Sequence, residues 1–102
     1  MAKFKINWSN LAENQYNYIL EYWYVITGNT KYSKKISRKT KRAIKTLQEF
    51  PESGSISKYY SLRKSALGDY TIYYKISGNN IEIVTFWDNR QDPQKLYELL
   101  NK

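Results

Sequence analysis

The side chains best suited to chemistry in this sequence are cations in its second half. Arg63 and Lys64 lie in one expected strand, Lys75 lies in the next, and Arg90 follows a third. Because residues on neighbouring strands meet across a sheet, we expect these four cations to converge on one shallow concave surface. Guanidinium and ammonium groups there would bind phosphate and stabilise negative charge that develops on it.

Arg90 has the most informative position of these cations. It stands in the segment Trp87-Asp88-Asn89-Arg90-Gln91-Asp92-Pro93, directly before an expected helix. Unpaired backbone N–H groups at a helix start attract anions, so they and the guanidinium could hold a phosphate together. The alternative is that Arg90 pairs with Asp88 or Asp92 and only clamps the chain.

Cleavage of RNA without a metal is one reaction that such cations could support. Arg63 and Arg90 would stabilise the charge on phosphorus, and another group would have to move protons. The sequence has no Cys and no His, which excludes thiolate chemistry, a Ser-His-Asp triad and a zinc site. The remaining proton carriers are Lys64, Tyr74 and Tyr97, and each would need a pKa far below its ordinary value. With neither a Gly-rich phosphate loop nor paired carboxylates, we expect no cofactor and no metal.

Residues 31–45 form the most strongly charged segment of the chain. Its eight cations are Lys31, Lys34, Lys35, Arg38, Lys39, Lys41, Arg42 and Lys45, with no acid between them. The whole chain has 17 Lys and Arg against 9 Asp and Glu, a net charge of +8. Like charges on one helix repel, so the segment is expected to bind nucleic-acid phosphate, together with Lys64 and Lys75. A merely solvated basic face is the alternative.

The patterns predict elements that position these residues. Residues 4–8 alternate as a strand does, and Asn10 with Glu13 resembles a capping box that starts a helix. Apolar residues then recur at helical spacing up to Gly28, and again over residues 32–50 before Pro51. We expect a loop at 51–57, strands at 58–63, 70–76 and 81–87, and a turn at 77–80. Asp92 before Pro93 predicts a short terminal helix.

These elements predict one α+β domain spanning residues 1–102. The order is β-α-α-β-β-β-α, with a helical hairpin packed on a curled, mainly antiparallel sheet. No apolar run approaches the roughly 20 residues that span a bilayer, and the N-terminus lacks the features of a secretory signal. The lack of Cys fits a reducing compartment, so we expect a cytoplasmic protein without a membrane partner.

The layout resembles the RelE/ParE superfamily of toxins over nearly the whole chain. The matching pieces are Trp8-Ser9 at the end of the first strand, Leu47-x-x-Phe50-Pro51, Leu62-Arg63, Tyr70-x-Ile72-x-Tyr74 and Arg90-Gln91-Asp92-Pro93. The resemblance implies a type II toxin–antitoxin system, in which a cognate antitoxin wraps and neutralises the toxin. One branch cleaves mRNA in the ribosome, and another poisons DNA gyrase.

The comparison with RelE-like nucleases is mixed. By resemblance, Arg63, Arg90 and Tyr97 fall on or near their catalytic positions. Thr71 stands where those nucleases have an arginine, and Asp88 stands where others have a histidine. The long first helix is more similar to the gyrase-poison branch.

Three functions follow as hypotheses. The charge favours a growth-arresting toxin that docks on the ribosome and cleaves mRNA. The alternatives are a non-enzymatic gyrase poison and a non-toxic nucleic-acid-binding module. In either toxin case the cationic surface suits an antitoxin segment that is acidic or amphipathic.

Overall fold

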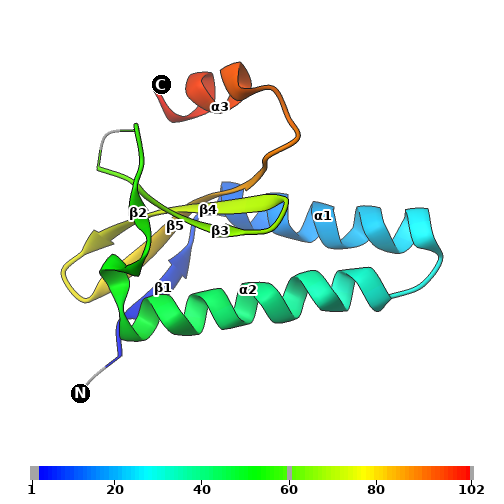
Figure 1. Ribbon diagram of the computed structural model, residues 1–102, viewed down its shortest axis with the longest axis horizontal. Helices are drawn as coiled ribbons and strands as arrows, with labels where there is room; N and C mark the ends of the chain where they lie inside the picture. The colour runs from blue at the N-terminus through cyan, green and yellow to red at the C-terminus, as the bar shows by residue number, and fades with distance from the viewer. Residues whose placement is uncertain (1–2, 60, 102) are drawn as a thin grey trace.

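The computed structural model describes residues 3–59 and 61–101. Its elements follow in the order β1 (Lys5–Trp8), α1 (Asn10–Thr27), α2 (Lys31–Glu49), the 3₁₀ turn η1 (Pro51–Ser53), β2 (Ser55–Ile56), β3 (Arg63–Leu67), β4 (Tyr70–Ser77), β5 (Asn80–Asp88) and α3 (Pro93–Leu100). The strands form one mixed sheet in the order β1-β5-β4-β3-β2, in which β1 alone runs parallel to its neighbour. The α1–α2 hairpin covers one face, and α3 lies on the other (Figure 1). The predicted fold class is therefore confirmed.

Each face of the sheet has its own core because side chains alternate along a strand. Ile72 and Tyr74 of β4 point toward the helical hairpin and are fully buried there, together with Phe86 of β5. Tyr73 and Trp87 point the other way and pack against Leu96 of α3, with the buried Tyr59 and Leu62 beside them. The short terminal helix therefore closes a second core.

The ends of α1 are set by local hydrogen bonds. The Ser9 hydroxyl accepts from the Ala12 N–H at 3.0 Å and donates to the Val84 carbonyl of β5 at 2.8 Å. The predicted capping box at Asn10 is wrong by one position, because Ser9 is the N-cap and Asn10 is the first helical residue. Gly28, at φ 72°, ends the helix in the left-handed conformation that glycine adopts without strain.

A bulge in β5 fixes α1 against the sheet. Tyr73 pairs with Thr85 but Tyr74 pairs with Ile83, which leaves one extra residue in β5. The Gln15 side-chain oxygen accepts from the Phe86 N–H at 2.9 Å and from the Thr85 hydroxyl at 2.7 Å. The Gln15 side chain thus ties α1 to β5 beside the bulge.

The predicted strand at 58–63 is wrong, and residue 60 lies outside the described residues. Ser61 has φ 61°, the Leu62 N–H donates to the Tyr59 carbonyl, and the Ser57 N–H donates to the Leu62 carbonyl. These bonds make a tight loop that turns Tyr59 and Leu62 inward, and β3 begins only at Arg63. The predicted loop at 51–57 instead contains η1 and the short strand β2, paired with the start of β3.

The other boundaries agree closely with the sequence patterns. Lys31–Glu49 replaces the predicted helix 32–50, and Gly78, at φ 59°, forms the β4–β5 turn. The Asp92 carboxylate accepts from the Gln94 N–H at 2.9 Å and caps α3, with Pro93 at its first position. No helix among the described residues is long and apolar enough to cross a membrane.

Candidate functional site

Arg90, just beyond the end of β5, is held by a carboxylate two residues away. Its Nε lies 2.9 Å from Asp88 Oδ1 and its Nη2 lies 3.0 Å from Asp88 Oδ2, a bidentate ion pair. The Arg90 backbone N–H also donates to Asp88 Oδ1. The clamp considered as the alternative role of Arg90 is therefore present, and Asp88 rather than Asp92 makes it.

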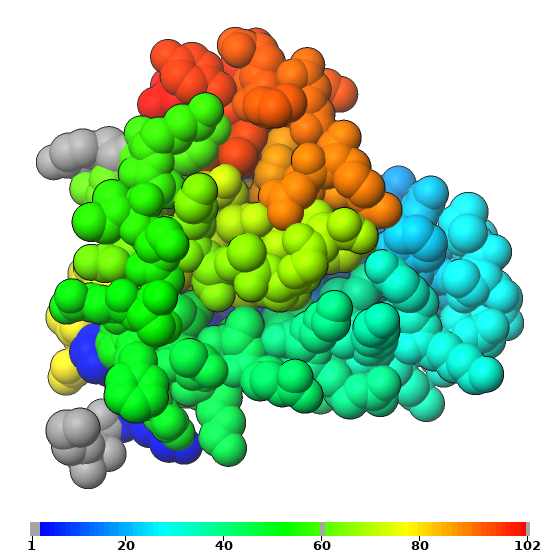
Figure 2. All heavy atoms as spheres, viewed as in Figure 1, coloured from blue at the N-terminus to red at the C-terminus, as the bar shows by residue number. Residues whose placement is uncertain are grey.

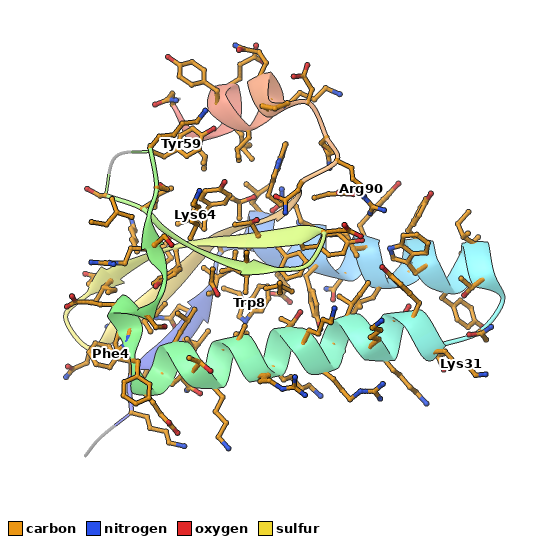
Figure 3. The ribbon with its side chains drawn as sticks, in the orientation of Figure 1. Phe4, Trp8, Lys31, Tyr59, Lys64 and Arg90 are labelled. Atoms are coloured by element: carbon orange, nitrogen blue, oxygen red, sulfur yellow. The ribbon has the colours of Figure 1, made fainter. Side chains whose placement is uncertain are left out.

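Tyr70 and Trp23 complete this cluster. The Tyr70 hydroxyl accepts from Arg90 Nη2 at 3.1 Å and from the Trp23 indole N–H at 2.8 Å. The guanidinium carbon also lies 5.6 Å from the centres of both rings, within range of a cation–π interaction. Arg90 thus joins β5, β4 and α1 at one point (Figure 3).

The ionisation of these groups follows from the same contacts. Burial alone would raise the Asp88 pKa, but the hydrogen bonds and charge of Arg90 outweigh it and lower that pKa. The hydrogen bonds to Asp88 raise the pKa of Arg90 further above its already high value. Burial raises the pKa of Tyr70. All three groups keep one protonation state near neutral pH, so the cluster offers no proton donor or acceptor there.

A cavity of about 480 Å³ lies between this cluster and α1. Tyr18, Tyr22 and Trp23 line its helical side, and Arg90 with Asp88 lines the other. Tyr18 and Tyr22 stack at 6.3 Å and are 62% and 45% exposed. Sequence reasoning missed these two tyrosines because it followed only the buried stripe of α1. Their four-residue spacing was the signal that could have found them.

Arg63 lies at a different place from Arg90. Its Nη1 donates to the carbonyls of Glu52 and Gly54 at 3.3 and 2.9 Å, and its Nη2 lies 3.7 Å from the Glu52 carboxylate. Arg63 pairs with Tyr74 across the sheet, whereas Asp88 pairs with Tyr70. Along β4 these two pairs are four residues apart, which is about 13 Å.

The remaining strand cations are also dispersed. Lys64 lines a cavity of about 360 Å³ on the α3 side of the sheet, with Tyr73 and Trp87 (Figure 3). Lys75 is exposed and lies 3.6 Å from the Glu82 carboxylate. The expected convergence of the four strand cations on one surface is therefore wrong. Hydrogen bonds and ion pairs with near neighbours hold three of them at separate points.

The proposed proton carriers lie apart as well. Tyr97 is 52% exposed on α3. Tyr74 is fully buried, donates to the Pro51 carbonyl at 2.7 Å and accepts from the Gly54 N–H at 3.0 Å. Burial raises the pKa of Tyr74, the opposite of what a base would need. Thr71, at the position of the missing arginine, donates to the Asn89 side chain at 2.9 Å.

The basic face of α2 is the outer surface of that helix, formed by the eight cations of residues 31–45. Lys34, Lys35, Arg38, Lys39, Lys41, Arg42 and Lys45 are all exposed, as is Lys31. Ile36, Thr40 and Leu47 occupy the opposite, buried side. Within residues 3–59 and 61–101, none of the eight makes an ion pair. Figure 2 shows α2 uncovered along the lower edge of the molecule.

Comparisons with known proteins give a family from one search and a shared fold from another. The family model described as "ParE toxin of type II toxin-antitoxin system, parDE" matches residues 6–93. A solved structure described as the chromosomal ParDE TA system from P. aeruginosa superposes with a TM-score of 0.71 at 18% identity. The match covers 84% of this chain and 96% of that one, and at this identity it shows the shared fold. A search of curated protein sequences gave no match.

Proposed function

The chain belongs to the ParE family of toxins from type II toxin–antitoxin systems, and from this premise we propose that it arrests growth by binding and poisoning DNA gyrase. In this proposal the toxin acts through its surface and performs no covalent chemistry. This proposal replaces RNA cleavage, the function that the positive charge of the sequence favoured.

The separation of the candidate catalytic groups carries this proposal. Metal-free RNA cleavage needs charge stabilisation and proton transfer within a few ångströms of one phosphate. Arg63 is bound to Glu52, Arg90 is bound to Asp88, and Tyr97 lies on the opposite face of the sheet from the helical hairpin. No described cavity is lined by two of these three residues.

Arg90 illustrates why the arrangement suits binding better than catalysis. A guanidinium that stabilises a transition state must direct its N–H groups at the substrate. Here Nε and Nη2 point at Asp88 and Tyr70, and only part of the fork remains free. The same contacts hold the end of β5 against α1, which is what a rigid binding surface requires.

The α1–α2 hairpin provides a surface for a protein target. Near its free end, Tyr22, Val25 and Ile26 are 45%, 68% and 60% exposed. Exposed apolar side chains of this size are typical of protein contacts rather than of phosphate contacts. The hairpin end extends beyond the sheet, where a large protein can reach it (Figure 1).

The proposal includes an antitoxin as the second protein partner. A toxin of a parDE pair must be held inactive in the cell by the other member. The net charge of +8 favours an acidic segment in that partner. Its binding would compete with gyrase wherever the two surfaces overlap.

The test compares purified gyrase with purified ribosomes. We expect the toxin to inhibit supercoiling and to trap cleaved DNA with gyrase, while primer extension on mRNA shows no new ends. Ile26→Ser, at the hairpin end, should weaken gyrase inhibition at least tenfold. Ile56→Ser is the matched control, because Ile56 is 76% exposed on β2, far from the hairpin end.

The outcomes are decisive. Unaltered supercoiling together with ribosome-dependent mRNA cleavage would overturn the proposal in favour of RNA cleavage. Full inhibition by Ile26→Ser, folded by circular dichroism, would remove the hairpin end from the contact, and equal losses in both variants would show that the effect is not local to it. Growth that continues undisturbed during expression without antitoxin would contradict any toxic action.

A further inference from the structure

The basic face of α2 forms a continuous band along the helix. At about 100° per residue, its eight cations cover an arc of roughly 160°, centred opposite the buried stripe. From Lys31 to Lys45 the band is about 21 Å long at 1.5 Å per residue. The α2 helix is packed on the core through Ile36, Thr40 and Leu47, so the band is presented on a rigid support.

The band lowers the stability of the folded protein. Five pairs of cations lie four residues apart and repel each other: Lys31–Lys35, Lys34–Arg38, Lys35–Lys39, Arg38–Arg42 and Lys41–Lys45. The first turn of α2 has no acid, and its N-cap Thr30 makes no side-chain cap hydrogen bond, so the helix dipole adds to the repulsion. No described acid neutralises the band. An external anion would relieve this strain.

The composition of the band indicates which anion fits. A protein interface needs an apolar centre, and single-stranded nucleic acid needs aromatic side chains on which bases stack. Among the described residues, the large exposed apolar and aromatic side chains lie on α1, at Phe50, on β2 and on α3, and none of these lies on the band. A cationic surface without either feature suits the regular phosphates of a duplex, which it would bind without reading base sequence.

We infer that the basic face of α2 binds the phosphate backbone of duplex DNA. A band of 21 Å spans about six base pairs at 3.4 Å each. The inference deepens the proposed function, because gyrase holds duplex DNA at the place where it is poisoned. The toxin would then contact the enzyme through the hairpin end and the DNA through α2.

The experiment measures binding of the purified toxin to a labelled 20-base-pair DNA duplex by fluorescence anisotropy between 50 and 200 mM NaCl. If about five phosphates are contacted, the logarithm of the association constant should fall with the logarithm of salt with a slope of about −4.5. The triple variant Lys35→Gln/Arg38→Gln/Arg42→Gln should bind at least tenfold more weakly. The salt dependence of this variant should be shallower, with a slope smaller in magnitude by about 3.

A control variant separates local binding from net charge. Lys5, Lys58 and Lys95 are exposed, and they lie on β1, before β3 and on α3. Lys5→Gln/Lys58→Gln/Lys95→Gln lowers the net charge from +8 to +5, as the α2 variant does. It should keep wild-type affinity to within about twofold. Equal losses in both variants would overturn the inference, because attraction would then depend on total charge alone.

Three other ligands complete the test. A single strand of equal length should bind more weakly than the duplex, and equal or tighter binding would overturn the inference. Tighter binding of polyglutamate of equal charge would assign the band to an acidic protein instead. A tenfold preference for an RNA duplex of the same sequence would reject DNA as the ligand.

Gyrase is absent from these measurements, so the inference and the proposed function can fail separately. Duplex binding without gyrase inhibition would leave the inference standing and remove the function. Gyrase inhibition without duplex binding would do the reverse. If both hold, the α2 variant should need at least tenfold more protein than wild type to trap cleaved DNA.

Discussion

Removing charge from the basic face of α2 should make the protein more stable. Lys35→Gln/Arg38→Gln/Arg42→Gln eliminates four of the five repulsive pairs at four-residue spacing. Exposed pairs of this kind change helix stability by about 0.2 to 0.5 kcal/mol each, so the variant should gain roughly 1 to 2 kcal/mol at low salt. Gln has nearly the helix propensity of Lys and Arg, so propensity contributes little to the difference.

The assay is thermal unfolding followed by circular dichroism at 20 and 500 mM NaCl. A gain of 1 to 2 kcal/mol corresponds to a rise in Tm of roughly 5 to 9 °C for a domain of this size. Salt screens the repulsion, so the wild type should become more stable at 500 mM and the gap to the variant should narrow. Lys5→Gln/Lys58→Gln/Lys95→Gln is the control and should shift the Tm much less.

A single outcome would contradict the repulsion along α2. If the α2 variant were no more stable than wild type at 20 mM NaCl, with the same dependence on salt, the band would carry no repulsive strain. An external anion would then relieve no repulsion on α2. An equal rise in the control variant would attribute the gain to net charge rather than to spacing along α2.

The other predictions concern the contacts that hold the sheet and its helices. Asp88→Asn should lower the free energy of unfolding at pH 7 by about 1 kcal/mol through loss of the partly exposed ion pair with Arg90. Because folding lowers the Asp88 pKa, the difference in free energy of unfolding between wild type and variant should shrink as the pH falls through and below that pKa. Urea titrations of both proteins at pH 7 and 3 measure this difference. Gly54→Ala should cost about 1 to 3 kcal/mol in urea unfolding, because a methyl group there overlaps the Tyr74 hydroxyl; an unchanged midpoint would contradict that contact. Leu47→Ala, at a position 1% exposed, should cost about 2 to 5 kcal/mol, and a smaller loss in differential scanning calorimetry would indicate a loosely packed hairpin.

The change in the role proposed for Arg90 shows why site prediction is harder than fold prediction. The sequence placed Arg90 beside two carboxylates and before a helix, and both a phosphate ligand and a clamp fitted those neighbours. The structure adds Tyr70 and Trp23, which are 20 and 67 residues away in the chain. These partners hold the guanidinium against Asp88, and no local pattern contains them.

Features that depend on residues within about four positions of each other follow from the amino-acid sequence alone. Gly28 ends α1, Asp92 caps α3, and the spacing of Ile36, Thr40 and Leu47 sets the buried side of α2. The exposure of the basic face follows, because a helix that buries one side must present the other to solvent.

The positions of distant cations relative to one another depend instead on how the strands pair. Arg63 lies on β3 and Arg90 follows β5. The register of both strands on β4 places Arg63 opposite Tyr74 and Asp88, the partner of Arg90, opposite Tyr70, about 13 Å away along the sheet. In a strand, Tyr59 and Leu62 would face opposite sides because they are three positions apart. Both are buried in the core under α3, so the chain turns before β3 instead of extending. Register and burial depend on how whole surfaces fit together, and short-range periodicity carries no information about that fit.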